Sequence, residues 1–184
     1  MLDVKRTEIE GVLLLTPKRW ADARGFFVET WNAERFRQAG LAHDFVQDNH
    51  SYSAEAGTVR GLHFQAPPRA QAKLVRVMRG AVMDVAVDVR RGSPTYGRHV
   101  RALLSAENGA QLFVPVGFLH GFATLEPHTD VAYKVTDFYS QAHDGAVIWN
   151  DADLGIDWGV DPGRAVLSDK DAKAPRFADF RSPF

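Results

Sequence analysis

Apolar and polar residues alternate in short runs along most of the chain, and turn residues separate the runs. In the segment 81–89, AVMDVAVDV, every second residue from Met83 to Val89 is apolar, which is typical of a strand. Similar runs are found at 60–65, 73–80, 99–105, 111–118, 120–126 and 129–139. About ten short strands without a β-α-β rhythm predict a mainly β fold, an antiparallel jelly-roll (cupin-like) barrel with a few short helices.

Turn signals mark the connections between these strands. Arg79-Gly80 predicts a hairpin turn between the strands that flank it, and Glu107-Asn108-Gly109 predicts another turn. No internal repeat, low-complexity tract or linker divides the chain. Residues 1–184 are therefore predicted to form one domain.

Two segments carry helix signals. NAERFRQAG begins with a capping residue, Asn32, and ends at Gly40, which predicts a helix of about two turns. SDKDAKA begins at Ser168, and the S-x-x-D spacing from Ser168 to Asp171 predicts a second, capped helix. The rest of the chain from Asp144 onward has no regular period, and we expect it to wrap the barrel as irregular structure.

The composition limits the partners. With 184 residues, 45% of them hydrophobic, and a net charge of −1, the chain can bury a core and has no bulk charge that favours nucleic acid or an anionic membrane. The longest apolar run near the start, GVLLL, is too short for a signal peptide or a spanning helix, so a soluble, cytoplasmic protein is predicted. Because there is no cysteine, disulfides, thiolate metal ligands and a cysteine nucleophile are excluded.

The segment RGLHFQ raises the first question of chemistry. Strand alternation places His63 and Gln65 on one face and Leu62 on the other. Arg60 would share the face of Leu62 unless Gly61 forms a bulge, so strand parity alone does not join Arg60 to His63. His63 itself could accept a proton, bind a metal or simply pack in the core.

A second histidine follows a turn in PVGFLHGF, where Gly117 turns the chain and His120 is expected just after a strand. H-x-Q followed by P-x-G-x-x-H is similar to a metal-binding cupin that lacks some ligands. A mononuclear site would need His-x-His and a nearby carboxylate, but here the second position is Gln65, a weak ligand. No acidic residue lies between Gln65 and Asp84, and Lys73 would repel a cation. The sequence therefore predicts no metal site.

Without a metal, side chains must carry the chemistry. His63 is a candidate base at neutral pH. Tyr133 shares its strand face with Val131, so it is either an inward proton donor or a core tyrosine. Lys73, at the start of an apolar strand, either meets an anion or a developing oxyanion, or reaches out to solvent. Asp171 either orients an imidazole or completes the helix cap.

Other polar residues could hold a ligand. Arg24 and Glu29 flank the aromatic pair Phe26-Phe27, and Arg24 and Arg60 are the best candidates to bind phosphate oxygens. The segment 47–53, QDNHSYS, offers amides that can recognise a planar polar ring or a sugar. Both segments could equally be turn and edge-strand residues. Neither GxGxxG nor GxxxxGK[ST] occurs, so any nucleotide would be held by side chains.

From about residue 3 to about residue 175, the chain closely resembles the dTDP-4-dehydrorhamnose 3,5-epimerase family. The resemblance is carried, in this order, by DARGFFVE, QDNHSYSAEAGTVRGLHFQAPP, QAKLVRVMRGAVMDVAVDVR, SPTYG, QLFVPVGFLHGF, VAYKVTDFY, VIWNDADLGIDW and LSDKD. It implies a metal-free and cofactor-free jelly-roll enzyme that acts on a dTDP-4-keto-6-deoxyhexose. It also implies a homodimer with strands exchanged across the interface.

The resemblance also implies residue roles. His63 matches the proton acceptor, Asp171 its carboxylate partner, Tyr133 the proton donor on the opposite face of the sugar, and Lys73 the residue near the C4 oxygen. The implied substrate-binding positions are Arg24, Phe27, Glu29, Gln47, Asn49, Arg60, His120, Tyr139, Asp144 and Lys170. Because the resemblance brings Arg60 and His63 to one pocket although strand parity separates them, a bulge or twist at Gly61 is predicted. Asp144 is a departure, because the family pattern commonly has Glu at this position.

The implied reaction is the inversion of C3 and C5 of dTDP-4-dehydro-6-deoxy-D-glucose to give dTDP-4-dehydro-L-rhamnose. Three alternatives stay open at this point. The same residues would serve an epimerase that acts at only one centre of another deoxysugar. A sugar-nucleotide-binding cupin without catalysis and a metal-dependent cupin are the other two.

Overall fold

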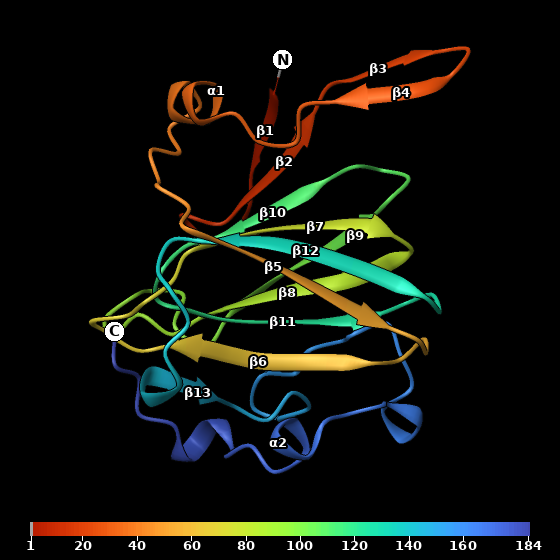
Figure 1. Ribbon diagram of the computed structural model, residues 1–184. Helices are drawn as coiled ribbons and strands as arrows, with labels where there is room; N and C mark the ends of the chain where they lie inside the picture. The colour runs from red at the N-terminus through yellow and green to blue at the C-terminus, as the bar shows by residue number, and fades with distance from the viewer. Residues whose placement is uncertain (1) are drawn as a thin grey trace.

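Two antiparallel β-sheets pack face to face in the computed structural model, which describes residues 2–184 (Figure 1). Met1, which the predicted domain includes, lies outside the described residues. One sheet has the order β1 (Leu2–Arg6), β2 (Leu13–Pro17), β10 (Gln111–Val114), β7 (Lys73–Arg79), β12 (Thr129–Val135), β5 (Gln47–Ser53). The other has the order β13 (Asp144–Ala146), β6 (Val59–Gln65), β11 (Phe118–Thr124), β8 (Ala81–Asp88), β9 (His99–Ser105). The predicted mainly β, antiparallel jelly-roll architecture is confirmed.

The remaining elements lie outside these two sheets. A two-stranded hairpin, β3 (Arg19–Asp22) and β4 (Gly25–Val28), projects away from the sandwich (Figure 1). The helices are α1 (Ala33–Gln38), α2 (Asp169–Ala172) and the single 3-10 turns η1 (Gln141–His143), η2 (Pro162–Arg164) and η3 (Phe177–Asp179). Within residues 2–184, no helix has both the length and the apolar character that crossing a bilayer requires.

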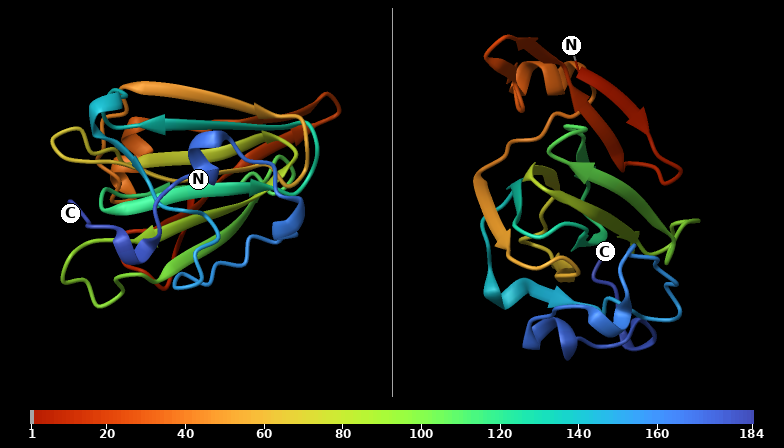
Figure 2. Two further views of the ribbon diagram at one scale, coloured as in Figure 1. Left: turned by 90° about the horizontal axis from the view of Figure 1, so that it is seen from below. Right: turned by 90° about the vertical axis from the view of Figure 1, so that its right-hand side faces the viewer.

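Three apolar clusters hold these layers together. The central one lies between the sheets and joins side chains such as Val75 and Val131 from the six-stranded sheet to Val82 and Phe122 from the other. A second cluster packs the outer face of the five-stranded sheet against the C-terminal segment, which lies beside β6 in all views (Figure 2). The third packs α1 against the outer face of the six-stranded sheet. The tail from Asp144 onward thus wraps the barrel as predicted, except that its first three residues form β13.

Both predicted helices are present, and their caps explain them. The side chain of Asn32 accepts a hydrogen bond from the Arg35 amide at 3.1 Å, and Gly40 follows α1 with a φ of +87°. The hydroxyl of Ser168 accepts a hydrogen bond from the Asp171 amide at 3.2 Å and starts α2.

The hairpin predicted at Arg79-Gly80 is wrong. Both edges of β7 are occupied, by β10 and β12, so β8 cannot pair with it and continues in the other sheet. The turn at Gly80 therefore carries the chain from one sheet to the other. A β-carbon at Gly80 would lie 2.3 Å from Oγ1 of Thr129, so the turn requires glycine.

The predicted bulge at Gly61 is confirmed. In the β6–β11 ladder, His63 pairs with His120 and Arg60 pairs with Phe122, so three steps along β6 match two along β11. Gly61 has a φ of +122°, and a β-carbon there would lie 2.6 Å from the Cα atom of Gly121. The bulge turns the side chains of Arg60 and His63 to the same face.

Candidate active site

Two adjacent cavities open between the sheets, and three side chains line both of them: His63, Lys73 and Tyr133. The first, of about 410 Å³, is called here the His120 cavity. It is lined by Ser51, Thr58, Val59, Arg60, His63, Lys73, His120, Phe122, Tyr133, Val166, Leu167, Ser168 and Asp171. The second, of about 370 Å³, is called the Tyr139 cavity. It is lined by Gln47, Asn49, His63, Phe64, Gln65, Gln71, Lys73, Tyr133, Tyr139, Asp144 and Lys170.

His63 forms a pair with the carboxylate of Asp171. Nε2 of His63 lies 2.5 Å from Oδ1 of Asp171, whose side chain is 4% exposed, and Oδ2 accepts a hydrogen bond from the Ser168 hydroxyl. Burial alone would raise the pKa of Asp171, but the hydrogen bonds from His63, Ser168 and the Gly61 amide lower it below its usual value. An ionised Asp171 holds the imidazole proton on Nε2, which leaves Nδ1 free to accept another.

Asp171 makes both of the contacts that its sequence position left open. Its backbone amide is capped by Ser168, and its carboxylate contacts His63. The two residues are 108 positions apart in the sequence, which is why their contact could not be predicted from strand parity.

Tyr133 lies on the opposite wall from His63. It is part of β12 in the six-stranded sheet, and its side chain packs against the central apolar cluster, as the pattern of β12 predicted. Burial raises the pKa of the phenol, and the positive charge of Arg60 opposes that shift. A phenol that keeps its proton at neutral pH can donate it.

Lys73 points inward at the start of β7. Its Nζ atom lies 6.0 Å from the ring centroid of Tyr133. Burial lowers the pKa of the ammonium to about 8, while the carboxylates of Asp84 and Asp144 oppose this shift and Lys170 adds to it. At neutral pH the ammonium is still mostly charged, so Lys73 can stabilise negative charge that develops in the cavity.

His120 follows β10 and the turn at Gly117, as the sequence predicted, and is the third residue of the next strand, β11. Its Nε2 atom lies 3.0 and 3.1 Å from the two carboxylate oxygens of Asp84, and this carboxylate is fully buried. No role of Asp84 was predicted from the sequence. The sequence held one signal for its position: in AVMDVAVDV, strand alternation puts Asp84 on the same face as Val82 and Ala86. The structure places these two residues in the central cluster, so this face points inward.

The Tyr139 cavity collects polar groups that can hold a nucleotide. The side-chain amide of Gln47 donates to Oδ1 of Asn49 at 2.8 Å and its oxygen accepts from the Tyr139 amide at 3.0 Å. Lys170 forms an ion pair with Asp144 across the same cavity. The ring of Tyr139 is 60% exposed and is free to stack on a planar base.

Gln65 has a structural part in the same cavity. Its side chain is buried, donates to the carbonyl of Phe138 at 3.0 Å, and accepts from the amide of Ser140 at 2.8 Å. Gln65 therefore fixes the loop that carries Tyr139. Within residues 2–184, no three His, Asp or Glu side chains are grouped so that they could hold a metal ion.

Three predicted substrate-binding residues do not line either cavity of this chain: Arg24, Phe27 and Glu29. Arg24 is on the tip of the β3–β4 hairpin, where its guanidinium pairs with Asp22 and its side chain is 89% exposed. Phe27 is 69% exposed on β4, and Glu29 pairs with Arg35 at 2.6 Å. The β3–β4 hairpin, which carries Arg24 and Phe27, projects away from the two sheets (Figure 1), and Glu29 directly follows β4.

The chain is similar over nearly its whole length to proteins of one known family. The family model described as dTDP-4-dehydrorhamnose 3,5-epimerase matches residues 6–179. A curated relative of that name from Sinorhizobium fredii is 51% identical over 176 residues, which cover 96% of this chain and 90% of the relative.

Solved structures of the same kind share the fold. The dTDP-4-dehydrorhamnose 3,5-epimerase of Bacillus anthracis, with TDP and pyrophosphate bound, is 51% identical and covers 96% of this chain and 100% of its own, with a TM-score of 0.93. A Legionella pneumophila 3,5-epimerase in complex with dTDP-4-keto-L-rhamnose is 41% identical, with a TM-score of 0.94. That alignment covers 98% of this chain and 95% of the other.

Proposed function

We propose that this chain, which belongs to the dTDP-4-dehydrorhamnose 3,5-epimerase family, is an isomerase that inverts C3 and C5 of dTDP-4-dehydro-6-deoxy-D-glucose. The product is dTDP-4-dehydro-L-rhamnose, the 4-keto sugar nucleotide bound in the Legionella structure. As an enzyme of sugar-nucleotide synthesis, it would act in the cytoplasm as one domain. The proposal includes no metal and no cofactor.

The observation that carries this proposal is the position of His63 and Tyr133 on facing sheets. An imidazole paired with Asp171 lies on β6, and a protonated phenol lies on β12 across the same two cavities. A sugar ring between them would meet a base on one face and an acid on the other. Inversion of a carbon needs this arrangement, because the proton must leave one face and return to the opposite one.

The C4 ketone makes the hydrogens on C3 and C5 acidic. Nδ1 of His63 takes one of these protons, and the electron pair of the broken C–H bond moves into an enolate whose oxygen carries the negative charge. The Lys73 ammonium stabilises this oxygen. Tyr133 then gives its proton to the carbon from the other face, and exchange with solvent restores the phenol and the neutral imidazole. A second cycle inverts the other centre.

The two cavities would hold different parts of the substrate. The three residues that line both cavities mark the place of the keto sugar, with Arg60 and His120 beside it. The thymidine diphosphate would lie in the Tyr139 cavity, held by Gln47, Asn49, Lys170 and the exposed ring of Tyr139. Asp144 stands where the family commonly has Glu. Its shorter side chain still forms an ion pair with Lys170 of the same chain.

The pH dependence of the rate tests the role of Lys73. Because the pKa of its ammonium is about 8 and the charged form is the one that stabilises the enolate, kcat/KM should fall as pH rises through about 8. Far above that pH, the decline should approach tenfold per pH unit. Measurement of kcat/KM between pH 6 and 10 checks this.

The variant Lys73→Arg supplies the control, because a guanidinium keeps its charge throughout this range. Its rate should be lower than that of the wild type, but the decline near pH 8 should disappear. A wild-type profile that is flat or rises through pH 8 would contradict the proposed role.

We also infer a homodimer in which the β3–β4 hairpin reaches the active site of a partner copy. The hairpin exposes three large aromatic side chains, Trp20, Phe26 and Phe27, and carries the cation Arg24. Such a surface is costly in water and typical of an interface. The resemblance that implied substrate contacts for Arg24, Phe27 and Glu29 would then apply to the substrate of the partner copy rather than to that of the same chain.

Mixing two inactive variants tests the dimer. Arg24→Ala lacks a hairpin contact and His63→Ala lacks the base, but a mixed dimer would combine an intact hairpin with an intact cavity at one of its two sites. After dissociation and random reassociation of equal amounts, activity should rise to about a quarter of the wild-type value, since half of the dimers would be mixed. Steady-state rates before and after mixing measure this.

The control mixture combines His63→Ala with Tyr133→Phe. Both changes lie in the cavity of one chain, so neither site of a mixed dimer is intact and activity should stay low. The dimer proposal would be wrong if the first mixture gains no more activity than the control although native mass spectrometry detects mixed dimers.

The proposed reaction is tested by incubation of the purified protein with dTDP-4-dehydro-6-deoxy-D-glucose. Ring-proton couplings in the NMR spectrum should show inversion at both C3 and C5. Inversion at one centre would indicate a single-centre epimerase, and an unchanged sugar would indicate a binding protein. Activity should survive a chelator; its loss, with restoration by an added metal, would overturn the metal-free mechanism.

A further inference from the structure

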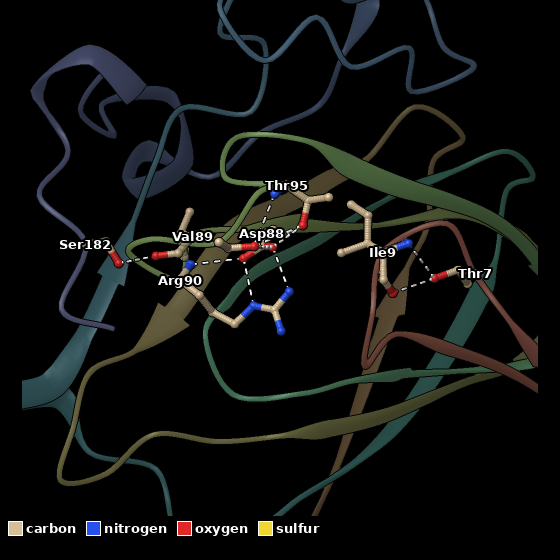
Figure 3. A network of polar contacts seen from close by, with 8 residues as sticks. Thr7, Ile9, Asp88, Val89, Arg90, Thr95 and Ser182 are labelled. Carbon is tan, nitrogen blue, oxygen red and sulfur yellow. Dashed lines mark hydrogen bonds and ion pairs between the residues drawn. The ribbon is translucent and has the colours of Figure 1, made fainter.

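The inner face of β8 carries two fully buried aspartates, Asp84 and Asp88, four residues apart. Asp88 accepts hydrogen bonds from the guanidinium of Arg90 at 2.7 and 2.9 Å and from the hydroxyl of Thr95 at 2.6 Å (Figure 3). The hydroxyl of Ser93 also donates to it at 2.6 Å. This network holds the 89–98 loop and lies outside the two cavities. Asp88 thus has a complete structural explanation.

Asp84 has no such explanation. Among the residues that the structure describes, its carboxylate has one hydrogen-bonding partner, Nε2 of His120, which faces both of its oxygens. A buried carboxylate is costly unless its charge is compensated, and one imidazole nitrogen is a modest compensation for two oxygens. His120 lines the cavity that also holds Lys73, so the charge of Asp84 lies just behind the wall of the reaction site.

Lys73 carries the opposite charge to Asp84, and burial of its ammonium is also costly. Its surroundings include the carboxylates of Asp84 on β8 and Asp144 on β13, which attract it, and Lys170 on α2, which repels it. The other ionisable groups that line its cavities are Arg60, His63, His120, Tyr133, Tyr139 and Asp171. Asp144 is already paired with Lys170, whereas within residues 2–184 no Lys or Arg side chain forms an ion pair with Asp84.

We propose that Asp84 is a positioning residue that fixes the ring of His120 and keeps Lys73 positively charged in the active site. This inference rests on the proposed role of Lys73 as the group that stabilises the enolate. Asp84 touches no substrate and acts through two residues that do. As the acceptor from Nε2, it sets the tautomer of His120, and as a fixed negative charge it opposes the loss of the Lys73 proton on burial.

The variant Asp84→Asn tests the inference, with Asp88→Asn as the matched control. Both changes remove one charge from the inner face of β8, but only the first lies at the cavity. Competitive labelling with acetic anhydride, followed by mass spectrometry of the peptide that contains Lys73, gives the pH at which this amine becomes reactive. This readout does not depend on turnover.

In the wild type, the labelling midpoint of Lys73 should lie near pH 8, in line with its pKa of about 8. Asp84→Asn should lower the midpoint by about one pH unit, the lower end of the shifts that a neighbouring opposite charge causes. The alkaline decline of kcat/KM should move by the same amount. Asp88→Asn should leave the midpoint in place even if it lowers the melting temperature.

Two results would overturn the inference: an unchanged midpoint in Asp84→Asn, or an equal shift in Asp88→Asn. If Asp84→Asn does not fold, carboxyl ¹³C NMR of the wild type provides the test, because the Asp84 resonance should move as Lys73 titrates near pH 8. A resonance that does not move contradicts the coupling. If the wild type shows the midpoint and its shift but no epimerisation, the proposed function fails while the coupling stands.

Discussion

Replacing His63 with alanine is expected to lower kcat by ~10²–10⁴-fold, the usual contribution of a positioned base. The Nδ1 atom that accepts the proton is lost, and the Asp171 carboxylate behind it loses its imidazole partner. KM should change little, because the imidazole acts on one C–H bond and leaves the nucleotide contacts in the Tyr139 cavity intact. Steady-state kinetics with the 4-keto substrate measure both constants.

His99→Ala provides a control for this change. His99 lies on β9, the edge strand of the five-stranded sheet, and lines neither of the two cavities. Its replacement should leave kcat near the wild-type value. If His63→Ala keeps more than about a tenth of the wild-type kcat, another group removes the proton, and the assignment of His63 as the base is wrong.

Replacing Tyr133 with phenylalanine is expected to separate proton removal from inversion. His63 remains, so C3 and C5 protons should still exchange with deuterated solvent when the imidazole returns a deuteron to the face it came from. Formation of the inverted product should fall by ~10²–10⁴-fold, because the donor on the opposite sheet is gone. NMR in D₂O measures exchange and inversion in the same sample.

The ratio of the two rates is the decisive quantity in this experiment. In the wild type, exchange and inversion should proceed together; in Tyr133→Phe, exchange should outrun inversion by a large factor. An equal loss of both rates would show that Tyr133 is needed before the proton is removed, which contradicts its role as the opposite-face donor. Circular dichroism checks that the loss of one hydroxyl leaves the fold intact.

Local patterns in the sequence predicted the strands and helix caps well. The period of two in TDVAYKV correctly placed Tyr133 on the inner face with Val131, since a strand's side chains alternate by geometry alone. For Lys73, the sequence left open whether the side chain points inward or reaches solvent, and the structure shows that it points inward. The conflict between the parity of Arg60 and its expected place beside His63 was itself informative. It predicted the bulge at Gly61 that the β6–β11 register shows.

Non-local contacts were not predictable in this way. Arg79-Gly80 has the composition of a hairpin, but whether two strands pair depends on which of their edges are already occupied. Asp84 and His120 are 36 residues apart, so nothing in the spacing joined them. The place of Arg24 on a projecting hairpin depends on how the chain leaves β2, which no periodicity encodes.

The central claim is double inversion by proton transfer across the cavity between the sheets. Incubation of the wild type with dTDP-4-dehydro-6-deoxy-D-glucose in D₂O, followed by NMR, tests it most directly, with His63→Ala as the blank for uncatalysed exchange. We predict deuterium at both C3 and C5 of dTDP-4-dehydro-L-rhamnose. Deuterium at only one of these carbons would contradict double inversion, and deuterium at neither would contradict proton transfer altogether.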